Sequence, residues 1–216
     1  HMAMLRYFGE HVNSFHVDTF REAMTSIEEG GADFAVLPIE NSTAGTVSEI
    51  YDLLVEFENY IVGEQILKIE HCLLGLPGTE ISQIRTVYAH PQSLMQSARY
   101  LGAHEDWKQI SLKNNAFAAR KVSGEGDRTQ AAIASEQAAK IYGLDILERG
   151  INQSETNSTR FIIVTNQKIF RKDAGKISIC LEVPHESGSL YHMLSHFIYN
   201  NLSMTKIESR PIEDRN

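Results

Sequence analysis

Residues 34–47 read FAVLPIENSTAGTV, an apolar run that meets a proline, a polar turn and then a glycine. We expect a strand over residues 33–37 that ends at Pro38, because proline has no backbone N–H and disrupts strand pairing. A helical pattern follows over residues 48–57. The order strand, polar turn, helix is typical of α/β sheets, which bind ligands at the carboxyl ends of their strands. The turn is therefore predicted either to hold an anion with its free donors or to be an ordinary capped loop.

The composition of the chain is that of a globular protein, with 42% hydrophobic and 22% charged residues among 216. The net charge is −8, and no basic stripe is present, which argues against nucleic acid or an anionic membrane as a partner. The apolar runs are too short to span a bilayer, and no signal peptide is visible. We therefore expect a cytoplasmic protein that does not bind membranes.

Sequence motifs for a metal or an organic cofactor are missing. His192 and His196 are four residues apart on an expected helix, but no third ligand is near in sequence. No GxGxxG, Walker or GxSxG pattern occurs. Cys72 and Cys180 each lie in an apolar strand-like run and are expected to be buried. We predict no metal and no cofactor.

The hydrophobic periodicity predicts repeated strand–turn–helix units. Helices are expected over residues 3–8, 19–29, 48–57, 93–101, 115–122, 136–142 and 189–200. Strands are expected over residues 11–17, 33–37, 60–62, 64–76, 84–88, 109–112, 131–134, 144–147, 160–165, 177–183 and 204–207. Polar turns at the strand ends predict two α/β lobes that face a shared cleft. A small βαβ unit with its own start follows the polar linker at residues 167–175.

Hydroxyl and amide side chains gather in four groups next to expected strands. The groups are Asn41, Ser42 and Thr43; His90, Gln92 and Gln96; Asn114 and Asn115; and Asn157, Ser158, Thr159 and Arg160. Neutral donors with one arginine suit an anionic substrate that must be oriented while one oxygen leaves. Any single group is more typical of a cap or turn, and the four together favour a site.

Several motifs resemble those of the prephenate dehydratase family and occur in the family's order. They are LPIENSTAG at residues 37–45, VYAHPQ at 87–92, AIASE at 132–136, YGL at 142–144 and NSTRF at 157–161. GSLY at residues 188–191 and ESRP at 208–211 resemble the two effector motifs of that family's ACT domain. The resemblance covers nearly the whole chain.

The resemblance implies a carbon–oxygen lyase that converts prephenate to phenylpyruvate, carbon dioxide and water on the route to phenylalanine. It gives Thr159 the role of donor to the departing hydroxyl, with Asn41 and Gln96 as the other catalytic residues. It further implies substrate binding by Ser42, Thr43, His90, Asn115, Arg160 and Phe161, with Arg160 beside a substrate carboxylate. The family's reaction requires no metal or organic cofactor.

The resemblance also implies the domain organisation. A dehydratase domain is expected at residues 3–166, with one lobe at 3–70 plus 152–166 and the other at 71–151, similar to type II periplasmic binding proteins. Residues 176–216 would form a partial ACT domain, a ferredoxin-like α+β fold, after the linker at 167–175. Phenylalanine would be its effector, and a homodimer or homotetramer is expected. The effector residues implied are Gly188, Ser189, Leu190, Glu208, Ser209, Arg210 and Pro211.

The sequence departs from the family pattern in three places. Ala89 stands where a serine is usual, which predicts lower activity or a water in place of the hydroxyl, and Asn114-Asn115 replaces a Ser-Thr pair. The family's opening strand and glycine-rich turn do not precede Ala3, and the ACT-like part ends at βαβ, so we expect a truncated form. Arogenate dehydratase and a catalytically silent amino-acid sensor remain alternatives, and an upstream chorismate mutase domain is left open.

Overall fold

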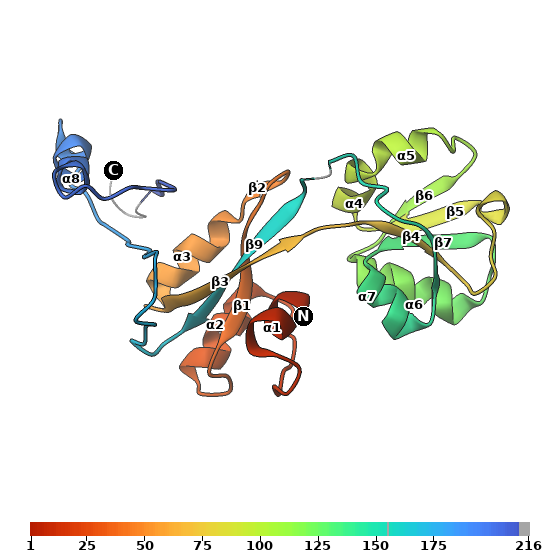
Figure 1. The fold of residues 1–216 in the computed structure, drawn as a ribbon, viewed down its shortest axis with the longest axis horizontal. Helices are drawn as coiled ribbons and strands as arrows, with labels where there is room; N and C mark the ends of the chain where they lie inside the picture. Colours follow the sequence, from red (N-terminus) through yellow and green to blue (C-terminus); the bar gives the residue numbers. More distant parts are fainter. Residues whose placement is uncertain (155, 212–216) are drawn as a thin grey trace. The chain divides into compact units, whose positions relative to one another are not determined.

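The computed structural model describes residues 1–154 and 156–211, and these form two compact units (Figure 1). The first unit contains His1–Ile39, Val47–Glu64 and the chain from Ile162 onward. The second unit contains Glu40–Thr46 and Gln65–Phe161. The described residues contain two sheets: the second belongs to the second unit, whereas the first includes strand residues of both units.

The first sheet has the strand order β2-β1-β9-β3. Its strands are β1 (Ala35–Asn41), β2 (Gly45–Thr46), β3 (Tyr60–Lys68) and β9 (Ser158–Thr165). The helices of the first unit are α1 (Met2–Phe8), α2 (Phe20–Glu28), α3 (Ser48–Glu56) and α8 (Ser189–Tyr199).

One apolar cluster joins α2 and α3 to this sheet. Met24 and Ile27 on α2 and Ile50 and Leu53 on α3 pack against alternate residues of β1 and β9. The alternation follows from the period of two in a strand, which sends every second side chain to the same face. Helix α2 begins where expected because the Thr19 hydroxyl accepts the N–H of Glu22 at 3.1 Å.

Strand β1 continues through Pro38 to Asn41, so the predicted end of the strand at Pro38 is wrong. The residues after the proline find new partners, because Glu40 and Asn41 pair with Thr46 and Gly45 of β2. These pairings compensate for the single donor that the proline lacks.

The second sheet is mixed and has the strand order β6-β5-β7-β4-β8. Strand β5 is parallel to β6 and β7, whereas β4 is antiparallel to β7 and β8. The strands are β4 (Cys72–Gly75), β5 (Thr86–Ala89), β6 (Lys108–Ser111), β7 (Gln130–Ala134) and β8 (Asp145–Glu148). The helices are α4 (Pro91–Gln96), α5 (Ala98–Gly102), α6 (Asn115–Glu125) and α7 (Glu136–Tyr142), with the 3₁₀ turn η1 (Ile81–Gln83).

Helices cover both faces of the second sheet (Figure 1): α4 and α5 lie on one side, and α6 and α7 on the other. The strand side chains divide between two clusters accordingly. Tyr88 belongs to the cluster with α6 and α7, while its neighbour Ala89 belongs to the cluster with α5. Ala89, where the family usually has a serine, is thus fully buried among apolar side chains.

The α/β fold class is confirmed, and the second sheet combines parallel and antiparallel strand pairs. All the predicted helices occur, although residues 93–101 divide into α4 and α5 at Ser97. Helix α7 ends at Gly143, a left-handed C-cap with φ 63°.

The strands predicted at residues 11–17, 177–183 and 204–207 are wrong, since the structure assigns no strand to these described segments. An apolar alternating segment becomes a strand only when a partner supplies hydrogen bonds, and two isolated strands are marginal at best. Cys180 lies in one of these segments and is exposed, contrary to prediction, whereas Cys72 is buried as predicted. Residues 212–216 of the predicted ACT domain lie outside the described residues.

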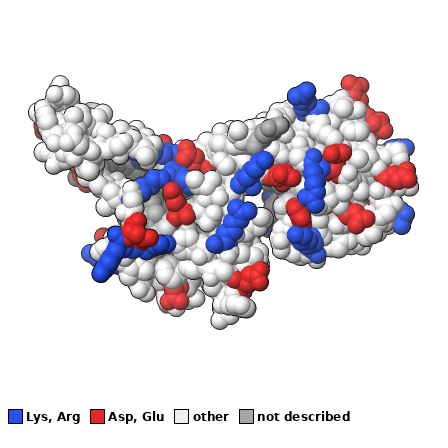
Figure 2. All heavy atoms as spheres, in the orientation of Figure 1, with Lys and Arg blue, Asp and Glu red and all other residues white. Residues whose placement is uncertain are grey.

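Among the residues described, no helix is long and apolar enough to cross a membrane. On the face drawn in Figure 2, basic and acidic side chains are interspersed, in keeping with the absence of a basic stripe in the sequence.

Candidate functional site

Two backbone N–H groups show which terminal atom of the Asn41 side chain is the oxygen. The N–H groups of Thr43 and Ala44 donate to Asn41 Oδ1 at 3.0 and 2.8 Å, which is an Asx turn. The N–H of Ser42 donates to the carbonyl of Ser158 at 2.9 Å. These three donors are therefore used within the protein, which favours the second of the two predicted alternatives, a capped loop, over an anion held by free donors.

The amide nitrogen of Asn41 points toward β9. Because Oδ1 faces the turn, Nδ2 is the atom that donates to Asn157 Oδ1 at 3.0 Å and to Thr159 Oγ1 at 2.9 Å. It also lies 3.2 Å from the carbonyl oxygen of Ser158. Thr159 thus accepts a hydrogen bond from Asn41, and its own hydroxyl proton can point toward another acceptor.

Four side chains from distant parts of the second unit close a ring of hydrogen bonds, which we call the amide ring. The Thr43 hydroxyl donates to Asn41 Oδ1 at 2.7 Å and accepts from Gln96 Nε2 at 2.7 Å. Asn157 Nδ2 donates to Gln96 Oε1 at 3.2 Å, and Asn41 Nδ2 completes the ring at Asn157. Each member is both donor and acceptor, so the ring holds Asn41 and Gln96 in defined orientations.

His71 contacts the amide ring from the interior. Its Nε2 lies 2.8 Å from Gln96 Oε1, and only 5% of the residue's surface is exposed. Burial lowers the pKa of the His71 imidazole, and the hydrogen bond with Gln96 opposes part of that change. Asn157 belongs to the fourth group of polar side chains predicted from the sequence, whereas we did not predict a role for His71. A polar residue at the edge of a buried strand was the available signal for His71.

A hollow of about 210 Å³ lies beside the amide ring. This volume is below the range usual for a whole ligand site, so the hollow suits one polar portion of a small molecule. Most of its lining groups are amides and hydroxyls, which can donate to an anionic oxygen. The lining residues are Thr43, Gln92, Met95, Gln96, Asn152, Gln153, Ser154 and Asn157.

Residues 1–169 match the family described as prephenate dehydratase. The chain belongs to the prephenate dehydratase family. The family match contains the whole amide ring, His71 and Thr159.

Curated relatives agree with this membership. A bifunctional chorismate mutase/prephenate dehydratase from Escherichia coli (strain K12) is 35% identical over 217 residues, which cover 98% of this chain and 56% of that protein. A chloroplastic arogenate dehydratase 3 from Arabidopsis thaliana is 39% identical over 199 residues, covering 90% of this chain and 46% of that protein. The chain thus spans about half the length of these relatives.

Two solved structures resemble the fold closely. Prephenate dehydratase from Arthrobacter aurescens, in complex with L-Phe, has a TM-score of 0.79 and 26% identity, covering 92% of this chain and 67% of that one. A protein described as GqqA, a novel type of quorum quenching acylase, has a TM-score of 0.81 and 28% identity, covering 99% of this chain and 78% of that one.

The arginine of the family's NSTRF motif contacts a carboxylate of this chain. Arg160 NH2 lies 2.9 Å from Glu40 Oε2, and the arginine side chain is 21% exposed. Arg160 and Thr159 are consecutive in β9 and therefore point to opposite faces of the strand. Ser42 ties the adjoining segment down, because its hydroxyl accepts from the N–H of Ser158 at 3.0 Å and donates to the carbonyl of Thr156 at 3.2 Å. Phe161 is half-buried.

His90 and Asn115, which the family resemblance also links to substrate, form their own cluster. The N–H of His90 donates to Asn115 Oδ1 at 2.8 Å, and Asn115 Nδ2 donates to the buried Ser93 hydroxyl at 2.7 Å. His90 Nδ1 accepts the N–H of Gln92 at 3.2 Å and caps α4. These contacts set the start of α4, the helix that carries Gln96.

The two segments whose sequences resemble the family's effector motifs lie in the first unit. Gly188 precedes α8 with φ 88°, a left-handed conformation that favours glycine, and the next residues are Ser189 and the exposed Leu190. Arg210 pairs with Asp52 of α3 at 2.6 and 2.9 Å, between exposed Ser209 and Pro211. Glu208 lies 3.8 Å from Lys206.

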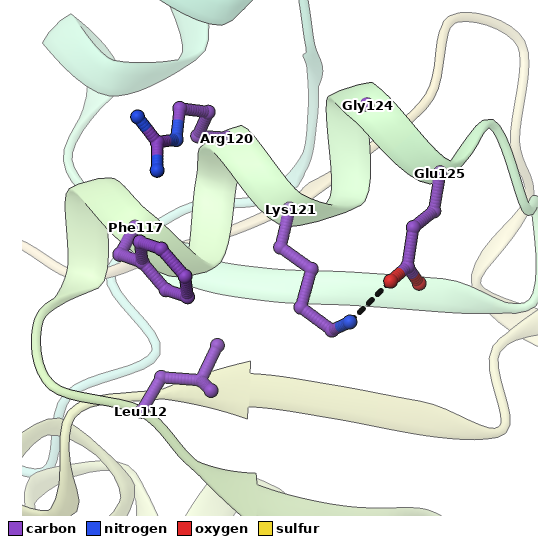
Figure 3. A pocket seen from close by; sticks show the side chains of 6 residues that line it. All are labelled: Leu112, Phe117, Arg120, Lys121, Gly124 and Glu125. Atoms are coloured by element: carbon purple, nitrogen blue, oxygen red, sulfur yellow. Dashed lines mark hydrogen bonds and ion pairs between the residues drawn. The ribbon is translucent and has the colours of Figure 1, made fainter.

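A second hollow of about 400 Å³ lies along α6 (Figure 3). Its two cations are engaged: Lys121 pairs with Glu125, and the Arg120 guanidinium lies 5.1 Å from the centre of the Phe117 ring. Leu112 and Gly124 complete its lining. Within the described part of the chain, no three His, Cys, Asp or Glu side chains are grouped as a metal site would require.

Proposed function

We propose that this chain carries out the prephenate dehydratase reaction, the decarboxylating dehydration of prephenate to phenylpyruvate in phenylalanine biosynthesis. Family membership supports this function. The observation that carries the proposal is the hydrogen bond from Asn41 Nδ2 to Thr159 Oγ1 at 2.9 Å. That bond makes Thr159 an acceptor toward Asn41 and so leaves its proton for a substrate oxygen.

The reaction itself explains why neutral donors suffice. The bond from the ring to its carboxylate breaks, carbon dioxide leaves, and the electron pair enters the ring. The bond from the ring to its hydroxyl breaks in turn, and the departing oxygen takes a proton to become water. Because the ring becomes aromatic, the step is strongly downhill, and the protein mainly orients the substrate and stabilises the leaving oxygen.

In the proposed mechanism Thr159 donates a hydrogen bond to the leaving hydroxyl. A threonine is too weak an acid to transfer a proton early, so the proton arrives late or through water. Asn41 orients the Thr159 hydroxyl, and Gln96, held by Thr43 and Asn157, orients the substrate beside the 210 Å³ hollow.

Arg160 is proposed to attract a substrate carboxylate from the face of β9 opposite Thr159, with its charge partly balanced by Glu40 at 2.9 Å. Ser42, His90, Asn115 and Phe161 are proposed to support substrate binding, Ser42 and His90 by fixing the backbone around the site.

Regulation by L-phenylalanine is proposed for the segment around Gly188 and Arg210, as part of an ACT-type domain in a homo-oligomer. The support is the pair of sequence motifs and the L-Phe complex of the Arthrobacter aurescens relative.

A substrate panel tests the activity. Phenylpyruvate release from prephenate is measured for the wild type, for Thr159→Val, which keeps the shape and removes the hydroxyl, and for Thr159→Ser, which keeps the hydroxyl. We expect Thr159→Val to lower kcat by about 10²- to 10³-fold with little change in KM, and Thr159→Ser to retain most of the rate. No turnover by a folded wild type, or full turnover by Thr159→Val, would overturn the proposal.

Arogenate is the second candidate substrate, because the Arabidopsis thaliana arogenate dehydratase is 39% identical to this chain. Arogenate carries an amino group where prephenate has a keto group, so the two are compared in the same assay. A larger kcat/KM for arogenate would assign that substrate instead. An acyl-amide substrate joins the panel because of the similarity to the quorum quenching acylase.

A further inference from the structure

We propose that His71 is a positioning residue, whose neutral imidazole carries its proton on Nε2 and fixes the Gln96 carboxamide so that its nitrogen faces Thr43. This inference rests on the proposed function, in which Gln96 orients the substrate. His71 lies behind Gln96, and it does not belong to the lining of the 210 Å³ hollow.

The direction of each hydrogen bond follows from the backbone of the turn. Backbone N–H groups can only donate, so the atom of Asn41 facing Thr43 and Ala44 is the oxygen. The Thr43 hydroxyl, 2.7 Å from that oxygen, must then donate to it. Its single proton being used, Thr43 can only accept from Gln96, which identifies the atom of Gln96 at 2.7 Å as Nε2.

The other end of the Gln96 carboxamide is therefore the oxygen, and it faces His71 at 2.8 Å. An oxygen requires a donor, so the proton of the imidazole is on Nε2. A second donor, Asn157 Nδ2, reaches the same oxygen at 3.2 Å. Reversing the Gln96 carboxamide would place its nitrogen against these two donors. It would also place its oxygen against the Thr43 hydroxyl oxygen, whose proton is already donated to Asn41.

Both backbone polar groups of His71 are hydrogen-bonded, which fixes the position of the backbone that carries the imidazole. The N–H of His71 donates to Asn152 Oδ1 at 3.0 Å, and its carbonyl accepts the N–H of Ile151 at 3.0 Å. Burial lowers the pKa of the imidazole, so the neutral form is favoured near pH 7. A neutral ring has one N–H, and here that N–H is committed to Gln96.

The first measurement reads the tautomer directly. Imidazole ¹⁵N spectra of the full chain at pH 7 should show His71 protonated on Nε2 and bare on Nδ1. A His71 ring protonated on Nδ1 would overturn the proposal. This readout does not depend on turnover, so it decides the contact with Gln96 even if the proposed reaction is wrong.

The second measurement uses prephenate turnover. His71→Leu removes the donor, and His71→Gln supplies a nitrogen that can reach the position of Nε2. We expect His71→Leu to lower kcat/KM about five- to tenfold and His71→Gln to restore most of it, as for the loss of one hydrogen bond. His104→Leu is the matched control, because His104 stacks on Trp107 in the same unit at 3.9 Å and should leave kcat/KM unchanged.

A double-mutant cycle separates positioning from general destabilisation. In a Gln96→Ala background, His71→Leu should have no further effect on kcat/KM, because the group that it positions is gone. Equal losses in both backgrounds, or equal losses for His71→Leu and His71→Gln, would overturn the proposal. A wild type that turns over while this coupling is zero contradicts only the role of His71. A folded wild type without turnover contradicts the proposed function. If His71→Leu does not fold, the role of His71 is decided by the tautomer measurement and by the turnover of His71→Gln.

Discussion

Asn41 donates through Nδ2 to the hydroxyl oxygen of Thr159, 118 residues further along the chain, at 2.9 Å. The orientation of that amide is imposed by the N–H groups of Thr43 and Ala44, which hold its oxygen. The turn after β1 thus determines in which direction the Thr159 proton can point.

Replacing Asn41 by aspartate tests this direction with almost no change of shape. In Asn41→Asp the donor becomes an acceptor, so the Thr159 hydroxyl would donate to the new carboxylate and face away from the substrate. We expect kcat for prephenate to fall by about 10²-fold or more. Steady-state kinetics with a thermal-unfolding control checks this, and a folded Asn41→Asp enzyme with the wild-type rate would contradict it.

The pair between Glu40 and Arg160 offers a test of charge. Glu40→Gln removes the negative charge 2.9 Å from the guanidinium, which should strengthen attraction for a substrate carboxylate and lower KM for prephenate about threefold. The matched control is Glu64→Gln, which removes a charge paired with Lys176 in the first unit. If KM for prephenate is unchanged or higher in Glu40→Gln, Arg160 does not contact the substrate.

Stability should depend on pH through His71. Burial places its pKa in the folded protein below the ordinary value of about 6.5. As pH falls below about 6.5, the unfolded chain binds a proton before the folded one does, so the free energy of unfolding decreases. Urea unfolding from pH 7.5 to 5 should show His71→Gln losing less stability than the wild type, by up to about 1.4 kcal/mol per pH unit. Parallel curves for the two proteins would contradict this.

Gly63 in β3 lies under the ring of Tyr7. A Cβ at this position would lie 2.5 Å from Tyr7 Cζ, so Gly63→Ala should destabilise the protein by about 1–3 kcal/mol. Gly102→Ala is the control, because open space surrounds the Cβ position there. The double variant Tyr7→Ala/Gly63→Ala should lose less unfolding free energy than the two single variants lose together. Additive losses in chemical denaturation would show that the ring does not press on this site.

The second unit was predictable from its sequence because its signals are local. Alternating apolar residues in β5 and β7 match two helix-covered faces, and the helix predicted at residues 136–142 is α7. Residues 177–183 carry the same alternation without a partner strand in the described chain, and periodicity cannot reveal whether a partner exists. The prediction that the strand ends at Pro38 failed for the opposite reason. Here a partner strand exists, because Glu40 and Asn41 pair with β2, and the lack of a backbone N–H at proline gives no sign of that partner.

The sequence predicted which residues form the site better than it predicted the hydrogen bonds between them. The family resemblance named Asn41, Gln96 and Thr159, and the structure brings all three into one hydrogen-bonded group. The direction of the bonds depends on which end of each amide faces which neighbour, and no sequence pattern encodes that. His71 was missed because it reads as part of an apolar strand.

The amide ring consists of carboxamides and a hydroxyl, groups that neither gain nor lose a proton in ordinary buffers. Its pattern of donors should therefore be the same in mildly acidic and mildly alkaline solution. Across that range, a change in turnover would report on ionisable groups outside the ring, in the substrate or in the protein, and the ring itself would act as a fixed electrostatic template.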